Sequence, residues 1–271
     1  VTGNLKNLSH IVGNLKVIDH DITIPFDGEF EIIINMACPA SPVDYQNIPL
    51  ETLWVSAMGT KNLLEIARKN KAMFLHASTS EVYGDPLVHP QKEDYWGNVN
   101  PNGPRSCYDE GKRFAESLIV NYQKVHGVNA RIFRIFNTYG PHMRANDGRV
   151  IPNFVSQAMA GDPITIDGDG NQTRSFCYVD DLVDGIISVM NAVDFSGPVN
   201  LGNPKETTIL ELAKMLLHLM GSKSEIVFKD LPQDDPKIRQ PDISKARTEL
   251  DFEPKVDLES GLKKTIAYFK V

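Results

Sequence analysis

The amino-acid sequence predicts an α/β protein with a doubly wound, parallel β-sheet. Short apolar runs of four to seven residues alternate with long amphipathic stretches, as expected for strands that are buried on both faces and crossed over by helices. Three such runs, at residues 31–36, 72–77 and 130–136, each lead into a polar or Gly/Pro-rich segment. In an open parallel sheet the ligand crevice lies at these carboxyl ends, so we expect functional residues there.

Helical spacing of apolar residues accounts for most of the remaining chain. One expected helix begins near residue 49, and its apolar face is formed by Leu50, Leu53, Trp54, Ala57, Leu64 and Ala67. A second should run over residues 107–126 and end at Gly127. Further helices are expected at residues 151–160, 181–192, 209–220 and 258–269.

The composition excludes several classes of protein. The net charge is −7, and no Lys/Arg block interleaves with aromatic residues, so a nucleic-acid surface is not expected. Cys38, Cys107 and Cys177 lack paired spacing, and His89 and His142 lack ligand partners, so we predict neither a disulfide framework nor a metal. No apolar run approaches the roughly 20 residues that span a bilayer, and a cytoplasmic location is the expectation.

Tyr108 and Lys112 form the first catalytic candidate. They stand four residues apart and therefore project from one face of the second helix. A phenol ordinarily has a pKa near about 10, and a neighbouring ammonium group favours the phenolate, so Tyr108 is a candidate base. The spacing by itself is also typical of ordinary helix packing.

The segment from Ala77 to Gly84, Ala-Ser-Thr-Ser-Glu-Val-Tyr-Gly, supplies the context that the Tyr–Lys pair needs. It begins where the predicted strand ends, so its hydroxyls and carboxylate can face the crevice. Together with the downstream Tyr-x-x-x-Lys, it resembles the extended short-chain dehydrogenase/reductase family. The resemblance implies a Rossmann-type fold, NAD as cofactor, and catalytic roles for Thr79, Ser80, Glu81, Tyr108 and Lys112.

Further motifs resemble the UDP-glucuronate decarboxylases within that family, in the same order from about residue 2 to the C-terminus. They include Ala-Cys-Pro-Ala-Ser-Pro from Ala37, Gly-Pro-Arg-Ser-Cys-Tyr from Gly103, Arg-Ile-Phe-Asn-Thr-Tyr-Gly-Pro from Arg134, and Gln-Thr-Arg-Ser-Phe from Gln172. This likeness implies NAD-dependent conversion of UDP-glucuronate to UDP-xylose through a 4-keto sugar. Related 4,6-dehydratases place an Asp-Glu pair where this chain has Ser80-Glu81, and a serine cannot act as the acid that expels the C6 hydroxyl.

The same resemblance implies the binding residues. The expected cofactor contacts are Asp21, Ile22, Ala37, Pro39, Ser78, Tyr108 and Lys112. The expected UDP-sugar contacts are Pro42, Tyr45, Asn137, Arg149, Val150, Gln172, Arg174 and Arg239, the last at the sugar end and also catalytic. Glu81 is harder to assign, because it would repel a substrate carboxylate unless one of the two is protonated or a cation intervenes. It is expected to promote loss of CO2 or to position a water molecule.

The organisation of the chain follows from this comparison. Residues 1–145 are expected to form the NAD-binding domain and residues 146–271 mainly the UDP-sugar lobe, with 175–203 returning to the first domain. The family's opening strand, glycine-rich loop and helix have no counterpart, since Gly13 follows Gly3 at the wrong spacing, and roughly 30 to 40 further residues are expected upstream. Helices at residues 49–70 and 107–124 carry more apolar side chains than one sheet face needs, including Trp54, Phe114, Leu118 and Tyr122. Either a packed core or the four-helix bundle of a homodimer would explain this surplus.

Three alternative functions stay open from the sequence. A nucleotide-sugar 4,6-dehydratase or 4-epimerase would share the fold and the Tyr–Lys pair. A non-catalytic UDP-sugar-binding protein without the dinucleotide loop would belong to a different class. The joint presence of Thr79, Glu81, Tyr108 and Lys112 favours an enzyme.

Overall fold

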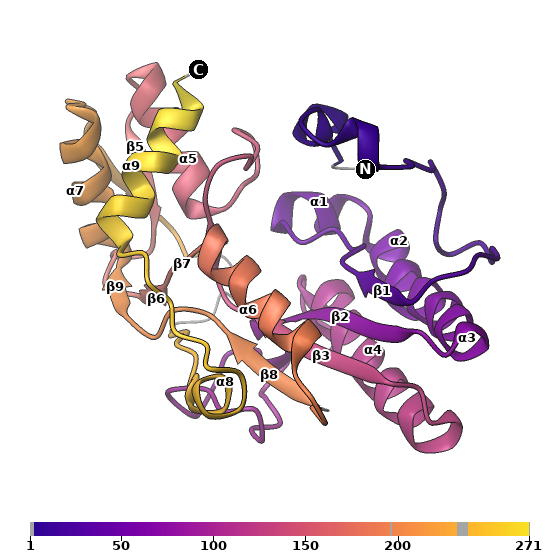
Figure 1. The fold of residues 1–271 in the computed structure, drawn as a ribbon. Coiled ribbons are helices and arrows are strands. Elements are labelled where there is room, and N and C mark those ends of the chain that lie inside the picture. Colours follow the sequence, from indigo (N-terminus) through magenta and orange to yellow (C-terminus); the bar gives the residue numbers. More distant parts are fainter. Residues whose placement is uncertain (1–2, 196, 232–237, 271) are drawn as a thin grey trace.

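Four parallel strands form the central sheet of the computed structural model, which describes residues 3–195, 197–231 and 238–270 (Figure 1). In spatial order the strands are β1 (Ile32–Asn35), β2 (Met73–Thr79), β3 (Ala130–Ile135) and β8 (Pro198–Leu201). Neighbours pair in parallel register, for example Ile33 with Phe74 and Phe133 with Val199. The prediction of a parallel sheet and of its first three strands is confirmed, with boundaries shifted by one or two residues.

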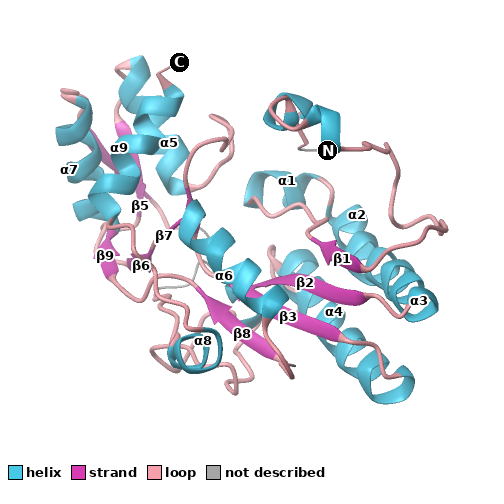
Figure 2. Ribbon diagram, viewed as in Figure 1, coloured by secondary structure: helices cyan, strands magenta, loops and turns pink. Residues whose placement is uncertain are grey.

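The first core lies on both faces of this sheet, because successive side chains of a strand point to opposite faces. Phe74 and Ile132 pack on one face, and their neighbours Leu75 and Phe133 pack on the other. The first face is covered by α3 (Thr60–Asn70) and α4 (Ser106–His126), and the second by α6 (Val179–Asn191) and α8 (Ser244–Leu250) (Figure 2). Burial on both faces explains why the strands read as continuous apolar runs.

The first expected helix is divided into three pieces. It consists of α2 (Pro49–Trp54), a π-helical segment η3 (Val55–Gly59) and α3. Here α4 approaches closely, since a Cβ at Gly111 would lie 3.0 Å from Ser56 Oγ. The second expected helix is confirmed: α4 ends at Gly127, whose φ of 66° is the left-handed conformation that glycine adopts at low cost.

A second core lies beyond the sheet, among residues from Tyr139 to Ile266. Three helices surround it, namely α5 (Val150–Ala160), α7 (Ile209–Met220) and α9 (Leu258–Phe269), together with the parallel pair β5 (Ile164–Asp167) and β10 (Ile226–Lys229). These helices and α6 occupy the expected positions. A capping box between Thr208 and Glu211 marks the start of α7.

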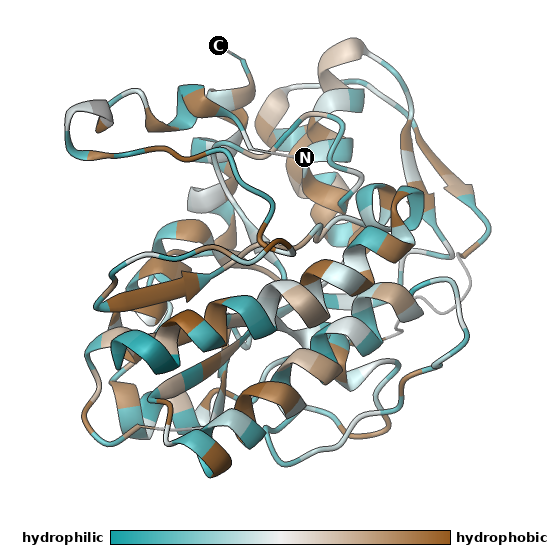
Figure 3. Ribbon diagram, turned by 90° about the vertical axis from the view of Figure 1, so that its right-hand side faces the viewer, coloured by the Kyte–Doolittle hydropathy of each residue, from teal (hydrophilic) through white to brown (hydrophobic). Residues whose placement is uncertain are grey.

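Shorter elements join the two cores at the carboxyl ends of the strands. They are α1 (Pro42–Asn47) after β1, the 3₁₀ turn η4 (Ser80–Tyr83) after β2, and the pairs β4 (Thr138–Tyr139) with β7 (Cys177–Tyr178) and β6 (Thr173–Ser175) with β9 (Glu206–Thr208). Two short turns, η1 (Leu5–Leu8) and η2 (Val12–Asn14), precede the sheet. Hydropathy alternates along the helices in Figure 3, and within the described ranges no helix is both long and apolar enough to cross a bilayer.

Candidate active site

The candidate site is centred on η4, the turn that follows β2. Thr79 is the N-cap of this turn, and its Oγ1 accepts a hydrogen bond from the Glu81 backbone N–H at 3.2 Å. This cap sets the direction of the turn and places Thr79, Ser80 and Glu81 at the carboxyl end of the strand. Thr79 and Ser80 are buried, and Glu81 is partly buried.

Tyr108 and Lys112 face the turn from the inner side of α4, and both are buried. The Lys112 Nζ donates to the Ala77 carbonyl oxygen at 2.8 Å and lies 5.8 Å from the centroid of the Tyr108 ring. Tyr108 shares a side-chain hydrogen bond with Thr79 and stacks on Tyr45 of α1, with ring centroids 5.0 Å apart. The fold therefore brings Thr79, Tyr108 and Lys112 together, as the sequence predicts.

The ionisation expected of Tyr108 is different in this structure. Burial raises the pKa of its phenol, and the nearby Cys38 thiol acts in the same direction. Burial also lowers the pKa of Lys112. In the protein alone Lys112 therefore does not hold Tyr108 as a phenolate, because burial raises the pKa of the phenol, and the role of Tyr108 as a base stays a prediction.

Glu81 is held by two arginines from distant parts of the chain. Arg239 binds both carboxylate oxygens, with Nη1–Oε1 at 2.7 Å and Nη2–Oε2 at 2.8 Å, and Arg105 Nη2 donates to Oε2 at 2.7 Å. Burial alone would raise the pKa of the Glu81 carboxyl, but the two guanidiniums outweigh it and lower the pKa to about 2. Glu81 is therefore a carboxylate at neutral pH, with cations in place beside it.

Two residues of this cluster have no role in the sequence interpretation. Arg105 is the N-cap residue of α4, and Asp109 follows Tyr108 directly. Asp109 is buried, and its Oδ1 has no hydrogen-bond partner among the described residues. Burial and the Glu81 charge raise the pKa of Asp109 to about 8, so its carboxyl is mainly protonated at pH 7. The closeness of Arg105 and Asp109 to Tyr108 in the sequence could have suggested a role in the site. Their interaction with Glu81, however, exists only in the folded chain.

The residues expected at the UDP-sugar end fall into two groups. Asn137 Oδ1 accepts from Arg239 Nη1 at 3.4 Å, and Arg174 is buried close enough to help lower the pKa of Glu81. Arg149 lies near Tyr108 and pairs with Asp147, while Val150 begins α5. Pro42 is the first residue of α1, the helix that carries Tyr45.

Gln172 makes up the second group. Its side chain donates to the carbonyl oxygen of Asp167 in its own turn.

The expected cofactor contacts are more dispersed. Ala37 and Pro39 follow β1, and Ala37 N–H donates to Asn35 Oδ1. Asp21 is exposed and accepts from Thr23.

Ile22 packs against Gly59 at the end of η3, and its carbonyl oxygen accepts from Asn62. Ser78 is buried at the end of β2, where its hydroxyl donates to Glu116 on α4.

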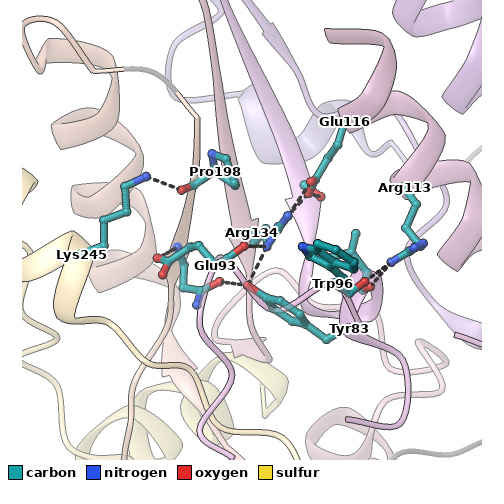
Figure 4. A network of polar contacts seen from close by, with 11 residues as sticks. Tyr83, Glu93, Trp96, Arg113, Glu116, Arg134, Pro198 and Lys245 are labelled. Atoms are coloured by element: carbon teal, nitrogen blue, oxygen red, sulfur yellow. Dashed lines mark hydrogen bonds and ion pairs between the residues drawn. The ribbon is translucent and has the colours of Figure 1, made fainter. Parts of the chain in front are cut away.

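A buried polar network lies behind η4 (Figure 4). Arg134 of β3 forms a two-pronged contact with Glu116 of α4, at 2.9 Å and 2.7 Å, and donates to the Tyr83 hydroxyl at 2.8 Å. Tyr83 in turn donates to Asn200 Oδ1 of β8 at 2.8 Å. The turn that carries Glu81 is therefore bonded to three strands or helices of the first core.

Comparison with known proteins gives consistent relatives. Residues 3–265 match the family model described as GDP-mannose 4,6 dehydratase. The chain is 53% identical over 99% of its length to UDP-glucuronic acid decarboxylase 1 of Danio rerio, and covers 64% of that protein. It is 51% identical over 96% of its length to UDP-glucuronic acid decarboxylase 3 of Arabidopsis thaliana, of which it covers 77%.

A solved structure supports the fold assignment. UDP-glucuronic acid 4-epimerase from Bacillus cereus, in complex with UDP-glucuronic acid and NAD, is 32% identical with a TM-score of 0.72. The alignment covers 80% of this chain and 68% of the epimerase. The chain spans a little under two thirds of the length of several of the decarboxylases it matches, including the Danio rerio protein.

Proposed function

This chain belongs to the GDP-mannose 4,6 dehydratase family and groups there with the UDP-glucuronic acid decarboxylases, and from that premise we propose that it converts UDP-glucuronate to UDP-xylose. The proposed reaction is NAD-dependent: oxidation at C4 of the sugar, loss of CO2 from C5, and reduction at C4. The observation that carries it is the Glu81–Arg239–Arg105 cluster beside the hydrogen-bonded pair of Thr79 and Tyr108.

The cluster removes the main objection to a carboxylate substrate. Glu81 alone would repel the C5 carboxylate of glucuronate. Two guanidiniums already bond to Glu81, so a second carboxylate arriving here meets a paired charge instead of a bare one. Ser80 stands where the dehydratase chemistry requires an acid, which favours decarboxylation over dehydration.

The residues near Tyr108 fit a nicotinamide cofactor with its ribose. Lys112 Nζ has three N–H donors, and Ala77 accepts one, which leaves donors for ribose hydroxyls. Ala37, Pro39 and Ser78 at the strand ends, with Asp21 and Ile22 farther out, complete the proposed contacts. When bound, NAD supplies the hydride acceptor and donor for C4.

Proton movements in the proposed reaction are assigned to the chain's own residues. Tyr108 takes the proton of the C4 hydroxyl while C4 gives up its hydride, and the ketone so formed lies β to the C5 carboxylate. The C5–carboxyl bond then breaks, CO2 leaves, and the electron pair enters the carbonyl. Thr79 and Tyr108 hold the enolate oxygen by hydrogen bonds while C5 takes a proton from water, and Tyr108 returns its proton to O4 as C4 regains a hydride.

The nucleotide is proposed to bind between the two cores, with residues 1–145 and 175–203 forming the NAD domain and the rest of 146–271 the UDP-sugar lobe. Pro42, Tyr45, Asn137, Arg149, Val150, Gln172 and Arg174 are the proposed contacts, with Arg239 at the sugar. The Tyr45 hydroxyl supports this proposal, because it is buried and lacks a hydrogen-bond partner among the described residues.

A homodimer through α2 and α4 completes the proposal. Trp54 and Phe114 are each more than half exposed, whereas Leu118 and Tyr122 pack inside the chain and Tyr122 donates to Glu65. The internal core thus accounts for half of this apolar set, and a second copy of the chain would cover the rest.

Incubation with UDP-glucuronate and NAD tests the proposed reaction. We expect release of CO2 and formation of UDP-xylose. NMR of the sugar protons measures the product. Formation of a 4-keto-6-deoxy sugar from UDP-glucose, or inversion at C4 without loss of CO2, would assign the chain to the dehydratases or epimerases instead.

A further inference from the structure

Gln91 is bonded on several sides to the segment that follows Arg239. Its backbone N–H donates to the Gln240 carbonyl oxygen at 2.9 Å, and its own carbonyl oxygen accepts from Asp242 N–H at 2.8 Å. The side-chain Oε1 accepts from Gln240 N–H at 2.9 Å, and Nε2 donates to the Val88 carbonyl oxygen at 2.8 Å. Gln91 is completely buried, so water does not replace these bonds.

Asn200 joins this segment to the turn of Glu81. Its Nδ2 donates to the carbonyl oxygens of Gln91 and Asp242, both at 3.0 Å, and its Oδ1 accepts from Tyr83 at the end of η4. Asn200 is also completely buried. One amide therefore holds the segment after Arg239 and the turn that carries Glu81 in a fixed relation.

The position of the Arg239 guanidinium depends on how these two segments are held. Its guanidinium meets both oxygens of Glu81 at 2.7 Å and 2.8 Å, a two-pronged geometry that tolerates little displacement. The two residues are far apart in the sequence, and the hydrogen bonds of Gln91 begin at the residue directly after Arg239. A loss of these bonds would release the backbone from which the guanidinium extends.

We propose that Gln91, supported by Asn200, is the positioning residue for Arg239 and thereby controls how well the site accepts a sugar bearing a carboxylate. The carboxylate part of this inference rests on the proposed function. An alternative role, in which Gln91 merely stabilises the loop, predicts a loss of stability without any effect specific to the sugar.

The test compares Gln91→Met with Gln157→Met. Methionine keeps the approximate volume of glutamine and removes its two side-chain hydrogen bonds, while the backbone bonds to Gln240 and Asp242 remain possible. Gln157 is the control, because its Oε1 likewise accepts a backbone N–H and its Nε2 donates, both with Thr165, between α5 and β5 in the second core. Calorimetry with UDP-glucuronate and with UDP separates effects on the sugar from effects on the nucleotide.

We expect Gln91→Met to weaken UDP-glucuronate binding and kcat/KM by roughly 10- to 100-fold while UDP binding changes little, the size of effect that a misplaced catalytic group causes. In an Arg239→Ala background the same substitution should have no further effect on the sugar. Equal losses for UDP and UDP-glucuronate, unchanged UDP-glucuronate binding, or multiplicative effects with Arg239→Ala would each overturn the proposal.

A readout without substrate separates this inference from the proposed function. Because Arg239 lowers the pKa of Glu81, its displacement raises that pKa toward the ordinary value, so stability between pH 5 and about 2 should fall less steeply in Gln91→Met than in wild type. Gln157→Met should keep the wild-type slope, and an unchanged slope in Gln91→Met would contradict the inference. A wild-type protein that releases no CO2 but shows this shift in slope would disprove the proposed reaction and retain the positioning role.

Discussion

At the scale of single residues, neighbouring groups determine which carboxyls of the site are ionised. Glu81 is partly buried and Asp109 is buried, yet the pKa of Glu81 is lowered to about 2 and that of Asp109 is raised to about 8. The difference arises because Arg239 and Arg105 bond directly to Glu81, whereas Asp109 Oδ1 has no partner within the described residues. One acid is therefore ionised and the other protonated at neutral pH.

Asp109 should make stability depend on pH. Its folded pKa, about 8, lies above the ordinary value, so the folded state binds the proton more tightly and loses stability as pH rises from about 4 through 8. The loss is at most about 1.4 kcal/mol per pH unit. Asp109→Asn, which is neutral throughout, should flatten this slope in urea denaturation between pH 5 and 9. A slope identical to wild type would show that Asp109 ionises normally.

Tyr108 is proposed to act at the sugar and not at the nucleotide. Tyr108→Phe retains the ring that stacks on Tyr45 and removes the hydroxyl that bonds to Thr79. We expect the rate of CO2 release to fall by about 10²- to 10⁴-fold, while UDP binding by calorimetry stays near wild type. A Tyr108→Phe enzyme with normal turnover would remove Tyr108 from the mechanism.

At the scale of elements, the turn after β2 is fixed by a close backbone approach. Gly84 ends η4 with φ of 63° and ψ of −139°, and a Cβ there would lie 2.1 Å from the Asn98 carbonyl oxygen. Only glycine fits both the dihedral angles and the space. The loop from Gly84 to Asn98, which contains Gln91, is therefore held directly against the turn that carries Glu81.

Two glycine substitutions separate the loss of stability caused by a strained backbone from the loss caused by steric overlap. Gly84→Ala should destabilise the protein by about 3 kcal/mol or more, because strain and overlap act together. Gly127→Ala, at the end of α4, should cost about 1 kcal/mol, since its positive φ is strained but its surroundings are open. Urea denaturation midpoints measure both, and equal costs would contradict the close approach at Gly84.

At the scale of the whole molecule, the packing of two helices leaves an apolar surface uncovered. Leu50, Trp54 and Phe114 are all exposed, although α2 and α4 pack against each other within the chain. Figure 3 views the side of the molecule on which these helices lie. Burial of this surface in the proposed dimer would gain roughly 25 cal/mol for each Å² of apolar area removed from water.

Charge on this surface should abolish the proposed dimer. For the wild type we expect a sedimentation mass of about twice the 30.2 kDa of the chain. Trp54→Glu together with Phe114→Glu should shift it to the monomer, because the carboxylates would be desolvated in the interface. Trp96→Glu is the control, since Trp96 is 89% exposed on the loop between β2 and α4. A wild-type monomer at micromolar concentration would contradict the proposal.

Periodicity in the sequence was sufficient to predict three of the four strands of the sheet and most of the helices. The strands and helices were predictable because a two-sided strand and an amphipathic helix each require local patterns of apolar residues. The Thr79–Tyr108–Lys112 group was predicted from the resemblance to the short-chain dehydrogenase/reductase family, because the Tyr–Lys spacing by itself is also typical of ordinary helix packing. The π-helical break at η3 was not predicted, because apolar spacing does not distinguish a π turn from an α turn.

Only the tertiary structure decided the charges at the site. Arg105, Asp109 and Arg239 interact with Glu81 through space, and their effect depends on distances and burial that no local pattern specifies. The same reason applies to Tyr108: the sequence revealed its ammonium neighbour but not the desolvation that raises the pKa of its phenol. Gln91 likewise has a role only in the folded chain, because its partners come from the distant segment that follows Arg239.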